Sequence, residues 1–434
     1  MPAGRVPVVQ SGTVEPTRAH AEQLDAADPL APFRARFAGT DDEGPDRLLY
    51  LDGNSLGRMP LATPAAVARV VEQEWAHGLV GSWSRWIGAA TRLGDQLGDG
   101  VLGAGPGQVL VGDSTTVNLY RLLVAGAAAR PGRDVLVCTA DDFPTDRYVV
   151  AGVARDRGMV VREIEADVDE GLDPAVLAEA LDERVAVVVL SLVAYRSGAL
   201  ADVAAVTRAV RDAGALVLWD LSHAVGAVPA DLDAAGTDLA VGCTYKYLNG
   251  GPGAPAFLYV RRDLQAGLRS PIQGWFGQRD QFAMGPEYVP GDGIERFGAG
   301  TPPVLGMAAV EVGAALVAEA GVDRLAAKAR AMTDLVVALG DAWLAPRGVA
   351  LASPRDATRR GAHVTFAHPR AWQLTQALVD RGVVPDFRTP DRVRLGPAPL
   401  YTRFVDVWDA MARFRDVLGD RSFEAYPTER ARVT

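Results

Sequence analysis

The stretch from Ala215 to Val260 places a carboxylate and a lysine directly after two apolar segments, and this pairing constrains the fold most strongly. The first segment, 215–219, is short, apolar and preceded by a glycine, which is typical of a buried strand, and Asp220 follows it. The second segment, 239–243, leads into Lys246 and a glycine-rich turn. Chemical groups gather at the carboxyl ends of strands in open α/β sheets. We therefore predict that both side chains lie at one sheet edge.

The scarcity of lysine makes Lys246 informative. Lys246 and Lys328 are the only lysines among 44 lysine and arginine residues. Unlike arginine, lysine can lose its proton and act as a nucleophile. Pyridoxal phosphate (PLP) needs such a lysine for its Schiff base, together with an acid that keeps its ring nitrogen protonated. On residue type alone a surface lysine is equally admissible, and Lys328, within a helical run, is interpreted in that way.

Composition limits the classes of partner. The net charge of −10 leaves no basic field for a nucleic acid, and no apolar run approaches the length of a transmembrane helix. The N-terminal residues lack the apolar core of a signal peptide. Cys138 and Cys243 each lie in an apolar run, far apart, and are interpreted as buried thiols rather than as a disulfide or metal pair. We expect a cytoplasmic protein that uses no metal.

Alternating apolar and amphipathic segments predict an α/β fold. Strands are expected at 109–112, 134–139, 185–194, 215–219 and 239–243, with helices at 64–75, 117–129, 147–158, 172–183 and 202–213. This order favours a mostly parallel sheet with helices on both faces. A long aromatic and glycine-rich segment, 270–303, and a helix, 304–320, then lead to a smaller α+β region. Its expected elements are helices 322–344, 371–381 and 404–418 and strands 363–367, 383–387 and 392–395.

These patterns divide the chain into domains. Residues 1–25 are predicted to be disordered, 26–60 to begin the small domain, 61–310 to form the large PLP-binding domain, and 311–434 to complete the small domain. A Gly-x-Gly-x-x-Gly pattern at 98–103 is rejected as a dinucleotide site because no strand precedes it.

Three further segments are candidates for the site. Thr115 and Thr116 open a helix, where hydroxyls are commonly caps but also suit a phosphate. Phe143 follows a strand and could stack on a flat cofactor, although a core position is the commoner role. Trp83 lies in a tryptophan-rich segment, 81–86, that would be unusual as free surface and suggests a pocket wall or a subunit interface.

Together these residues resemble the kynureninase family, whose members are PLP enzymes of the aspartate aminotransferase fold (fold type I). The similarity extends from about Tyr50 to Trp408. It rests on six segments: Tyr50-Leu-Asp-Gly-Asn-Ser-Leu-Gly57, Phe143-Pro-Thr-Asp146, Asp220-Leu-Ser-His223, Tyr245-Lys-Tyr-Leu-Asn249 with Gly251-Pro-Gly253, Gly274-Trp-Phe-Gly277 and Gly300-Thr-Pro-Pro303. Any one of them could occur by chance, but the ordered set is specific.

The resemblance implies a role for each matching residue. Lys246 would bind the cofactor covalently and act as the base, and Asp220 would pair with the ring nitrogen. Tyr245 would bind the cofactor phosphate and would also be the acid that protonates Cβ. The substrate would contact Ser55, Trp83 and Arg394, with Arg394 holding its α-carboxylate. The remaining cofactor contacts would be Thr115, Thr116, Phe143, Asp146, Ser191, His223, Trp275 and Thr301, with the last two reaching the phosphate from the partner subunit of a homodimer. Without the resemblance, His223 would be interpreted as a core histidine and Arg394 as surface.

The implied reaction is hydrolysis of kynurenine to anthranilate and alanine. Trp83 and Thr301 resemble the bacterial type, which favours the unsubstituted substrate, although an enzyme for a modified kynurenine would look nearly the same. Two positions depart from the family pattern: Gln278 stands where a histidine is usual, and Arg58-Met59 is an uncommon continuation of the Asn-Ser-Leu-Gly segment. An aminotransferase, a cysteine desulfurase and a cofactor-free interaction protein on the same fold are the alternatives.

Overall fold

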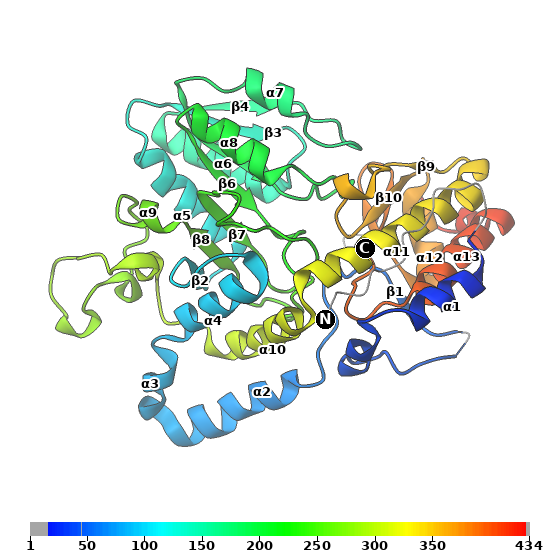
Figure 1. The fold of residues 1–434 in the computed structure, drawn as a ribbon, viewed down its shortest axis with the longest axis horizontal. Coiled ribbons are helices and arrows are strands. Elements are labelled where there is room, and N and C mark those ends of the chain that lie inside the picture. Colours follow the sequence, from blue (N-terminus) through cyan, green and yellow to red (C-terminus); the bar gives the residue numbers. More distant parts are fainter. Residues whose placement is uncertain (1–15, 45, 431–434) are drawn as a thin grey trace.

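A seven-stranded sheet forms the centre of the larger part of the protein (Figure 1). The computed structural model describes residues 16–44 and 46–430. The strands run in the order β2-β8-β7-β6-β5-β3-β4, and only β8 is antiparallel to its neighbours, so the predicted mostly parallel sheet is confirmed. Their bounds are β2 Val109–Val111, β3 Val135–Thr139, β4 Val160–Ile164, β5 Val185–Ser191, β6 Leu216–Asp220, β7 Leu239–Gly242 and β8 Phe257–Val260.

Both faces of this sheet are buried, as the continuous apolar runs of its strands require. In β6, Leu216 and Leu218 pack in one apolar cluster, and Val217 and Trp219 pack in another on the opposite face. Helices α5 (Thr115–Ala128) and α6 (Pro144–Arg157) cover the first face. Helices α4 (Ala89–Leu97), α8 (Val203–Asp212) and α10 (Val304–Ala320) contribute to the second. The short α7 (Pro174–Glu179) packs against α8.

A four-stranded antiparallel sheet, in the order β12-β13-β10-β9, forms the centre of the smaller part. Its strands are β9 (Ala350–Leu351), β10 (Val364–Ala367), β12 (Asp386–Arg388) and β13 (Arg392–Leu395). The expected single strand 383–387 is instead two, because β11 (Val383–Val384) pairs in parallel with β1 (Leu49–Tyr50) before the chain turns into β12. Helices α1 (Arg18–Ala26), α11 (Val322–Leu339), α12 (Ala371–Asp380) and α13 (Phe404–Asp420) share its apolar cluster.

Two predictions about the chain are wrong. The disorder predicted for 1–25 does not hold from Arg18 onward, because α1 is a helix capped by Thr17 whose Leu24 is buried; residues 1–15 lie outside the described residues. Lys328 is not a surface lysine, since its Nζ lies 2.7 Å from Asp28 and both side chains are buried. The sequence pattern alone did not reveal helix α1, and Asp28, the partner of Lys328, lies in the loop that follows this helix.

The remaining elements surround the large sheet. Helix α2 (Thr63–Arg69) continues as a wider helix over Val70–Gly78, followed by a short turn and α3 (Trp83–Trp86). The segment after α9 (Arg262–Gln265) contains short 3₁₀ turns at Trp275–Gly277, Gln281–Ala283 and Gly293–Phe297, which agrees with the irregular excursion expected there. Within the described residues no single helix is long and apolar enough to span a membrane; α10 and the helical stretch after it pass that test only as a pair bent by 80°.

The domain division stays a proposal, but the packing shows where the apolar clusters meet. Leu325 and Ala329 of α11 pack in a cluster of the large sheet, whereas Ala331 and the residues after it pack with the small sheet. Near the N-terminus, Phe33 and Phe37 pack with the large sheet, and Leu49 packs with the small one. The change from one apolar cluster to the other therefore falls within α11.

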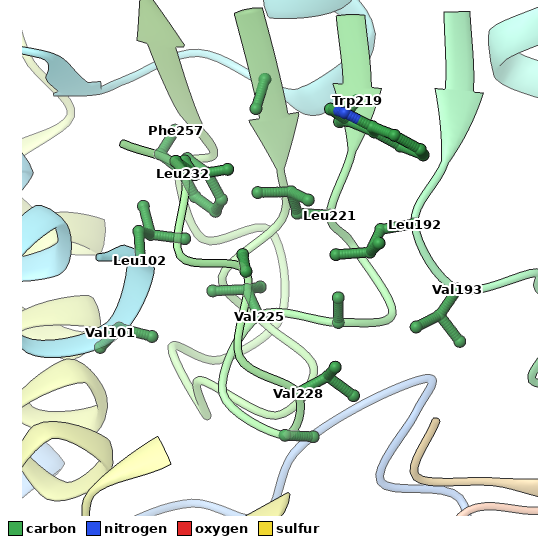
Figure 2. Close-up of a cluster of buried hydrophobic side chains, with 14 of the residues drawn as sticks. Val101, Leu102, Leu192, Val193, Trp219, Leu221, Val225, Val228, Leu232 and Phe257 are labelled. Carbon is green, nitrogen blue, oxygen red and sulfur yellow. The ribbon is translucent and has the colours of Figure 1, made fainter. Parts of the chain in front are cut away.

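An apolar layer supports the loop that follows β6 (Figure 2). Val225, Val228 and Leu232 of this loop are buried beside Val101 and Leu102 from the turn after α4. The loop is therefore packed on its inner side and holds the residues at the end of β6 in fixed positions.

Candidate active site

Lys246 lies in a buried turn after β7, beside His223 from the loop after β6. The Nζ atom of Lys246 is 3.1 Å from Nε2 of His223, and both side chains are buried. Burial lowers the pKa of Lys246, an effect that the Asp220 carboxylate opposes. Burial and the nearby lysine lower the pKa of His223 well below its usual value. Both shifts act toward the uncharged forms of the amine and the imidazole.

The carboxyl groups of Asp220 and Asp146 lie close together at the carboxyl ends of the strands. Asp220 ends β6 beside Ser191 of β5, and its Oδ1 accepts a hydrogen bond of 2.8 Å from the Ser222 amide. Neither oxygen of Asp146 accepts a hydrogen bond within the described residues, although both are buried. Burial and the neighbouring Asp220 raise the pKa of Asp146 well above its usual value. We infer that Asp146 is the protonated member of the pair.

The loop after β3 brings Phe143 to the same edge. Asp142 fixes this loop, since its two oxygens accept hydrogen bonds from the amides of Thr139 and Ser191 at 3.1 and 3.3 Å. The ring of Phe143 packs edge-on against Tyr195, with ring centres 5.4 Å apart. The structure thus joins Phe143, Asp146, Ser191 and the β6 residues in one region.

The threonines of α5 lie at the start of a 14-residue helix. Ser114, which precedes them, is the cap, because its hydroxyl accepts from the Val117 amide at 3.3 Å. Thr115 and Thr116 occupy the first two helical positions, where backbone N–H groups have no partner within the helix. The hydroxyls of Thr115 and Thr116 are therefore not needed as caps and suit an anion at the helix end.

Arg394 enters the site from β13 of the small sheet and is fully buried. Its Nη1 donates to the Tyr195 carbonyl at 2.6 Å, and its Nη2 donates to Ser55 Oγ at 3.1 Å and to Asp386. The Asn54 amide, in the orientation that these bonds require, accepts from Nε at 2.7 Å. These contacts connect the small sheet to the loop after β5 and to the segment after β1, so the candidate site lies between the two sheets.

Three further predicted residues, Trp83, Trp275 and Thr301, come from the tryptophan-rich segment and from the segment after α9. Trp83 and Trp275 pack against each other with ring centres 6.1 Å apart, and Trp275 is 39% exposed. Thr301 is exposed and lines a hollow of about 450 Å³ together with Asp113 and Phe276. Within the described chain, no hydrogen bond, ion pair or ring contact joins this group to Lys246, His223 or Asp220, which is the arrangement expected if these residues serve the site of another subunit.

Both departures from the family pattern have structural roles. Gln278 folds its own loop: its Nε2 donates to the Glu287 carbonyl at 3.0 Å and its Oε1 accepts from the Val289 amide at 2.7 Å. Arg58 lies over the rings of Tyr50 and Tyr401, at 5.3 and 5.9 Å from their centres. Neither side chain contacts Lys246.

A backbone hydrogen bond between Gly57 and Tyr245 stabilises the turn that contains Lys246. The Gly57 amide donates to the Tyr245 carbonyl at 2.8 Å, and a Cβ on Gly57 would clash with the Lys246 carbonyl, so only glycine fits there. Burial raises the pKa of the Tyr245 phenol, which therefore retains its proton.

Sequence patterns missed several residues of this region. His363 is fully buried, with its ring centre 5.7 Å from that of His223. Asp386 and Arg388 of β12 lie beside Arg394. All three come from the small sheet, and no spacing relates them to the strand ends of the large one. Only the family resemblance pointed to the small sheet, through Arg394.

Comparison with known proteins gives the family. Residues 325–414 match the model of the kynureninase C-terminal domain. A kynureninase of Burkholderia pseudomallei is 44% identical over 417 residues, which cover 94% of this chain and 97% of that protein. The chain belongs to the kynureninase family. A kynureninase of Pseudomonas fluorescens is 41% identical over 415 residues with the same coverage.

Solved structures similar to this kynureninase-family chain agree with the fold predicted for it. A C-DES mutant with glycine covalently linked to its PLP cofactor superposes with a TM-score of 0.77 at 17% identity, covering 88% of this chain and 99% of that one. An apo cysteine desulfurase from Thermococcus onnurineus gives 0.76 at 17% identity, covering 86% and 95%. At this identity the likeness establishes the aminotransferase-like fold alone.

The residues of this kynureninase-family site fit PLP. A buried amine of lowered pKa is available for an aldehyde, and Asp220 lies at the neighbouring strand end. Apart from the neighbouring Asp220, the buried oxygens of Asp146 have no partner among the described residues, and Ser114 caps only the Val117 amide in the first turn of α5. These polar groups are available to a bound cofactor. Within residues 16–44 and 46–430, no group of three or more His, Cys, Asp or Glu side chains is arranged to hold a metal ion.

Asp52 gives a pH-dependent prediction for the kynureninase-family fold. Burial, followed by the Asp386 carboxylate, raises the pKa of Asp52 to about 6, above its unfolded value of about 3.9. The folded state therefore binds more protons between these values, and stability falls as pH rises through this window. We expect Asp52→Asn to raise the free energy of unfolding by about 1–2 kcal/mol at pH 8 and to have no such effect near pH 4. Urea unfolding at both pH values measures this; an equal effect at both would contradict it.

Proposed function

We propose that this protein hydrolyses the Cβ–Cγ bond of L-kynurenine, or of a ring-substituted kynurenine, to anthranilate or its substituted form and L-alanine, with PLP as cofactor. The observation that carries the proposal is the buried Lys246–His223 contact beside Asp220, in a chain 44% identical to a kynureninase over nearly its full length. We further propose a cytoplasmic enzyme, which the two buried free thiols support.

Each step needs a group that this chain supplies. When bound, PLP provides an electron-withdrawing ring that stabilises negative charge on the carbons of the substrate. Lys246 would hold the cofactor and, as a neutral amine, remove the proton from Cα. His223 orients this amine through their 3.1 Å contact. Asp220 would keep the ring nitrogen protonated, and Thr115 and Thr116 would hold the phosphate at the start of α5.

Tyr245 is the candidate acid for the last proton transfer. Its phenol keeps its proton because burial raises its pKa, so the proton is available when Cβ becomes basic on loss of the Cγ acyl group. Water adds to the γ-carbonyl, and the acyl fragment leaves as anthranilate. Protonation of Cβ then yields alanine. One water is consumed for each kynurenine that is cleaved.

Cysteine chemistry is disfavoured despite the likeness to desulfurases. A desulfurase needs an accessible thiolate. Burial raises the pKa of Cys138 to about 12 and also raises that of Cys243, and both thiols are inside the core. An aminotransferase stays as the second candidate, because the lysine and acid would serve it equally.

An assay with L-kynurenine tests the proposal. Purified protein supplied with PLP should release anthranilate, detected by its fluorescence, and alanine in equal amounts without any keto acid. Turnover that depends on added 2-oxoglutarate would instead identify an aminotransferase. If the enzyme released neither anthranilate nor alanine from kynurenine, and likewise cleaved no 3-hydroxykynurenine, the proposed reaction would be refuted. The ratio of the rates with the two substrates gives the ring preference.

We also propose a homodimer in which Trp275 and Thr301 complete the partner's site. Support comes from the exposed aromatic and apolar side chains of Trp75, Leu79, Val80, Trp275, Phe282 and Met284, which would be costly to leave in water. The ring contacts of Trp275 within its own chain are to Trp83, Phe276 and Phe282.

Mixed dimers test the shared site. Lys246→Ala and Trp275→Ala chains should each be inactive alone, whereas co-expression should restore about one quarter of wild-type activity, because half of the randomly paired dimers contain one intact site. Activity is measured on the mixture after both chains are purified together. No recovery in proven heterodimers would mean that Trp275 serves its own chain's site.

A further inference from the structure

Glu74 is a buried carboxylate that the proposed reaction does not use. Of residues 71–77, all of which the structure describes, only Glu74 is buried, and its side chain is 8% exposed. It lies in the middle of the wider helix Val70–Gly78. A carboxylate so far from water is costly unless charged or polar groups pair with it. The groups that pair with Glu74 therefore show what this residue holds together.

The two carboxylate oxygens of Glu74 each accept a hydrogen bond, and its backbone carbonyl accepts a third. Nη1 of Arg69 donates to Oε1, and Nε1 of Trp86 donates to Oε2 at 2.6 Å. The Ser82 hydroxyl donates to the Glu74 carbonyl at 2.8 Å. Leu79, in the turn between helix and α3, has a φ of 47°, which a residue with a side chain adopts only where its surroundings hold it. Glu74 thus joins α2, this turn and α3.

Trp86 connects Glu74 to the aromatic cluster of the candidate site. Its ring packs edge-on against Trp83, with ring centres 5.8 Å apart, and Trp83 packs in turn against Phe276 at 6.0 Å. Phe276 lines the hollow of about 450 Å³ beside Thr301, and so does Ile87, which follows Trp86 in the chain. One wall of this hollow is therefore connected, ring by ring, to the indole that Glu74 binds.

Packing alone does not fix the indole of Trp86. A second hollow, of about 390 Å³, is lined by Trp86 together with Glu74, Arg69 and Arg85. An indole without its hydrogen bond would have room to turn into this hollow, whereas a close-packed interior would hold it in place. The bond from Nε1 to the Glu74 carboxylate therefore selects one orientation of the ring.

We propose that Glu74 is a positioning residue for the aryl ring of the substrate, because it holds Trp86 and, through it, the ring of Trp83 in one arrangement. The inference rests on the proposed function, in which the hollow beside Thr301 belongs to a site that cleaves kynurenine. It assigns part of the selectivity for the ring to a residue that touches neither substrate nor cofactor.

The two products of the proposed reaction test this role separately. Anthranilate carries the aryl ring, and its binding to the PLP-loaded enzyme is measured by equilibrium dialysis. L-alanine carries the amino-acid part, and its binding is measured by the absorbance of the bound cofactor. We expect Glu74→Leu, which removes the acceptor at similar size, to raise the Kd of anthranilate about tenfold, the size of one lost hydrogen bond. The Kd of L-alanine should change by less than about twofold.

Three further variants separate the hydrogen bond from the fold. Trp86→Phe removes the same bond from its other end and should weaken anthranilate by a similar factor, also where Glu74→Leu does not fold. The double variant should bind no more weakly than either single one, because all three lack the same bond. Glu74→Gln keeps an acceptor oxygen and should stay within about threefold of the wild type. Glu72→Leu, which replaces an exposed glutamate of the same helix, is the matched control and should change neither Kd.

The outcomes that overturn the proposal are distinct from those that refute the reaction. Equal weakening of both ligands would show a general loss of structure. Unchanged anthranilate binding in Glu74→Leu and Trp86→Phe, or no anthranilate binding by the wild type, would show that ring binding does not depend on Glu74. Neither titration requires cleavage, so a wild type that releases no anthranilate from kynurenine would refute the proposed reaction alone.

Discussion

Lys246→Arg will lose at least about 10⁴-fold in kcat, because arginine keeps its proton and can act neither as a nucleophile nor as a base. The buried Nζ of Lys246, of lowered pKa and 3.1 Å from His223, is the only such amine within the described residues that adjoins Asp220. Rates of anthranilate release measure the loss. Retention of more than about one hundredth of wild-type kcat would remove Lys246 from the mechanism.

The chain contains its own control, because Lys328 is the only other lysine. Lys328 of α11 forms a buried ion pair with Asp28 at 2.7 Å. Lys328→Arg should therefore change the free energy of unfolding but leave kcat unchanged. Borohydride reduction gives a second measurement: it fixes a lysine-bound aldehyde cofactor, and peptide mass mapping should find the added mass on the peptide with Lys246. The same mass on the peptide with Lys328 would contradict the assignment.

Much of the fold was predictable because its strands are buried on both faces. The continuous apolar run at 185–194 corresponds to β5 (Val185–Ser191), and the helix expected at 304–320 is α10. Strand β4 was not predicted, because it lies at the sheet edge, where Val160 is exposed and Arg162 and Glu163 interrupt the apolar pattern. A strand that is buried on both faces is therefore easier to predict from its local sequence than a strand at the outer side of the sheet.

The site was predictable only where the fold itself gathers residues. Asp220 and Lys246 follow neighbouring strands, so the sheet brings them together without further information. Arg394 and Tyr195 are 199 residues apart in the chain, and their hydrogen bond depends on how the small sheet docks against the large one. Arg388 and His363 were missed for the same reason. Docking of two sheets is decided by long-range packing, which no short motif encodes.

Asp220→Asn is expected to lower kcat by about 10²–10⁴-fold, whereas Asp146→Asn should lower it by less than about tenfold. The backbone amide of Ser222 donates to Asp220, which suits a charged carboxylate, and the ring nitrogen of PLP needs that charge to stay protonated. Burial and Asp220 raise the pKa of Asp146 well above its usual value, so an uncharged amide replaces it with little electrostatic change.

Comparing the two substitutions isolates charge from shape, because both exchange one carboxyl oxygen for an amide nitrogen in neighbouring buried positions. The absorbance of the bound cofactor at saturating PLP should be similar in both variants, which separates loss of catalysis from loss of cofactor. Asp220→Glu, which keeps the charge but moves it, should fall between Asp220→Asn and the wild type. If Asp146→Asn is the more damaging change, Asp146 carries the charge and the roles of the two acids are reversed.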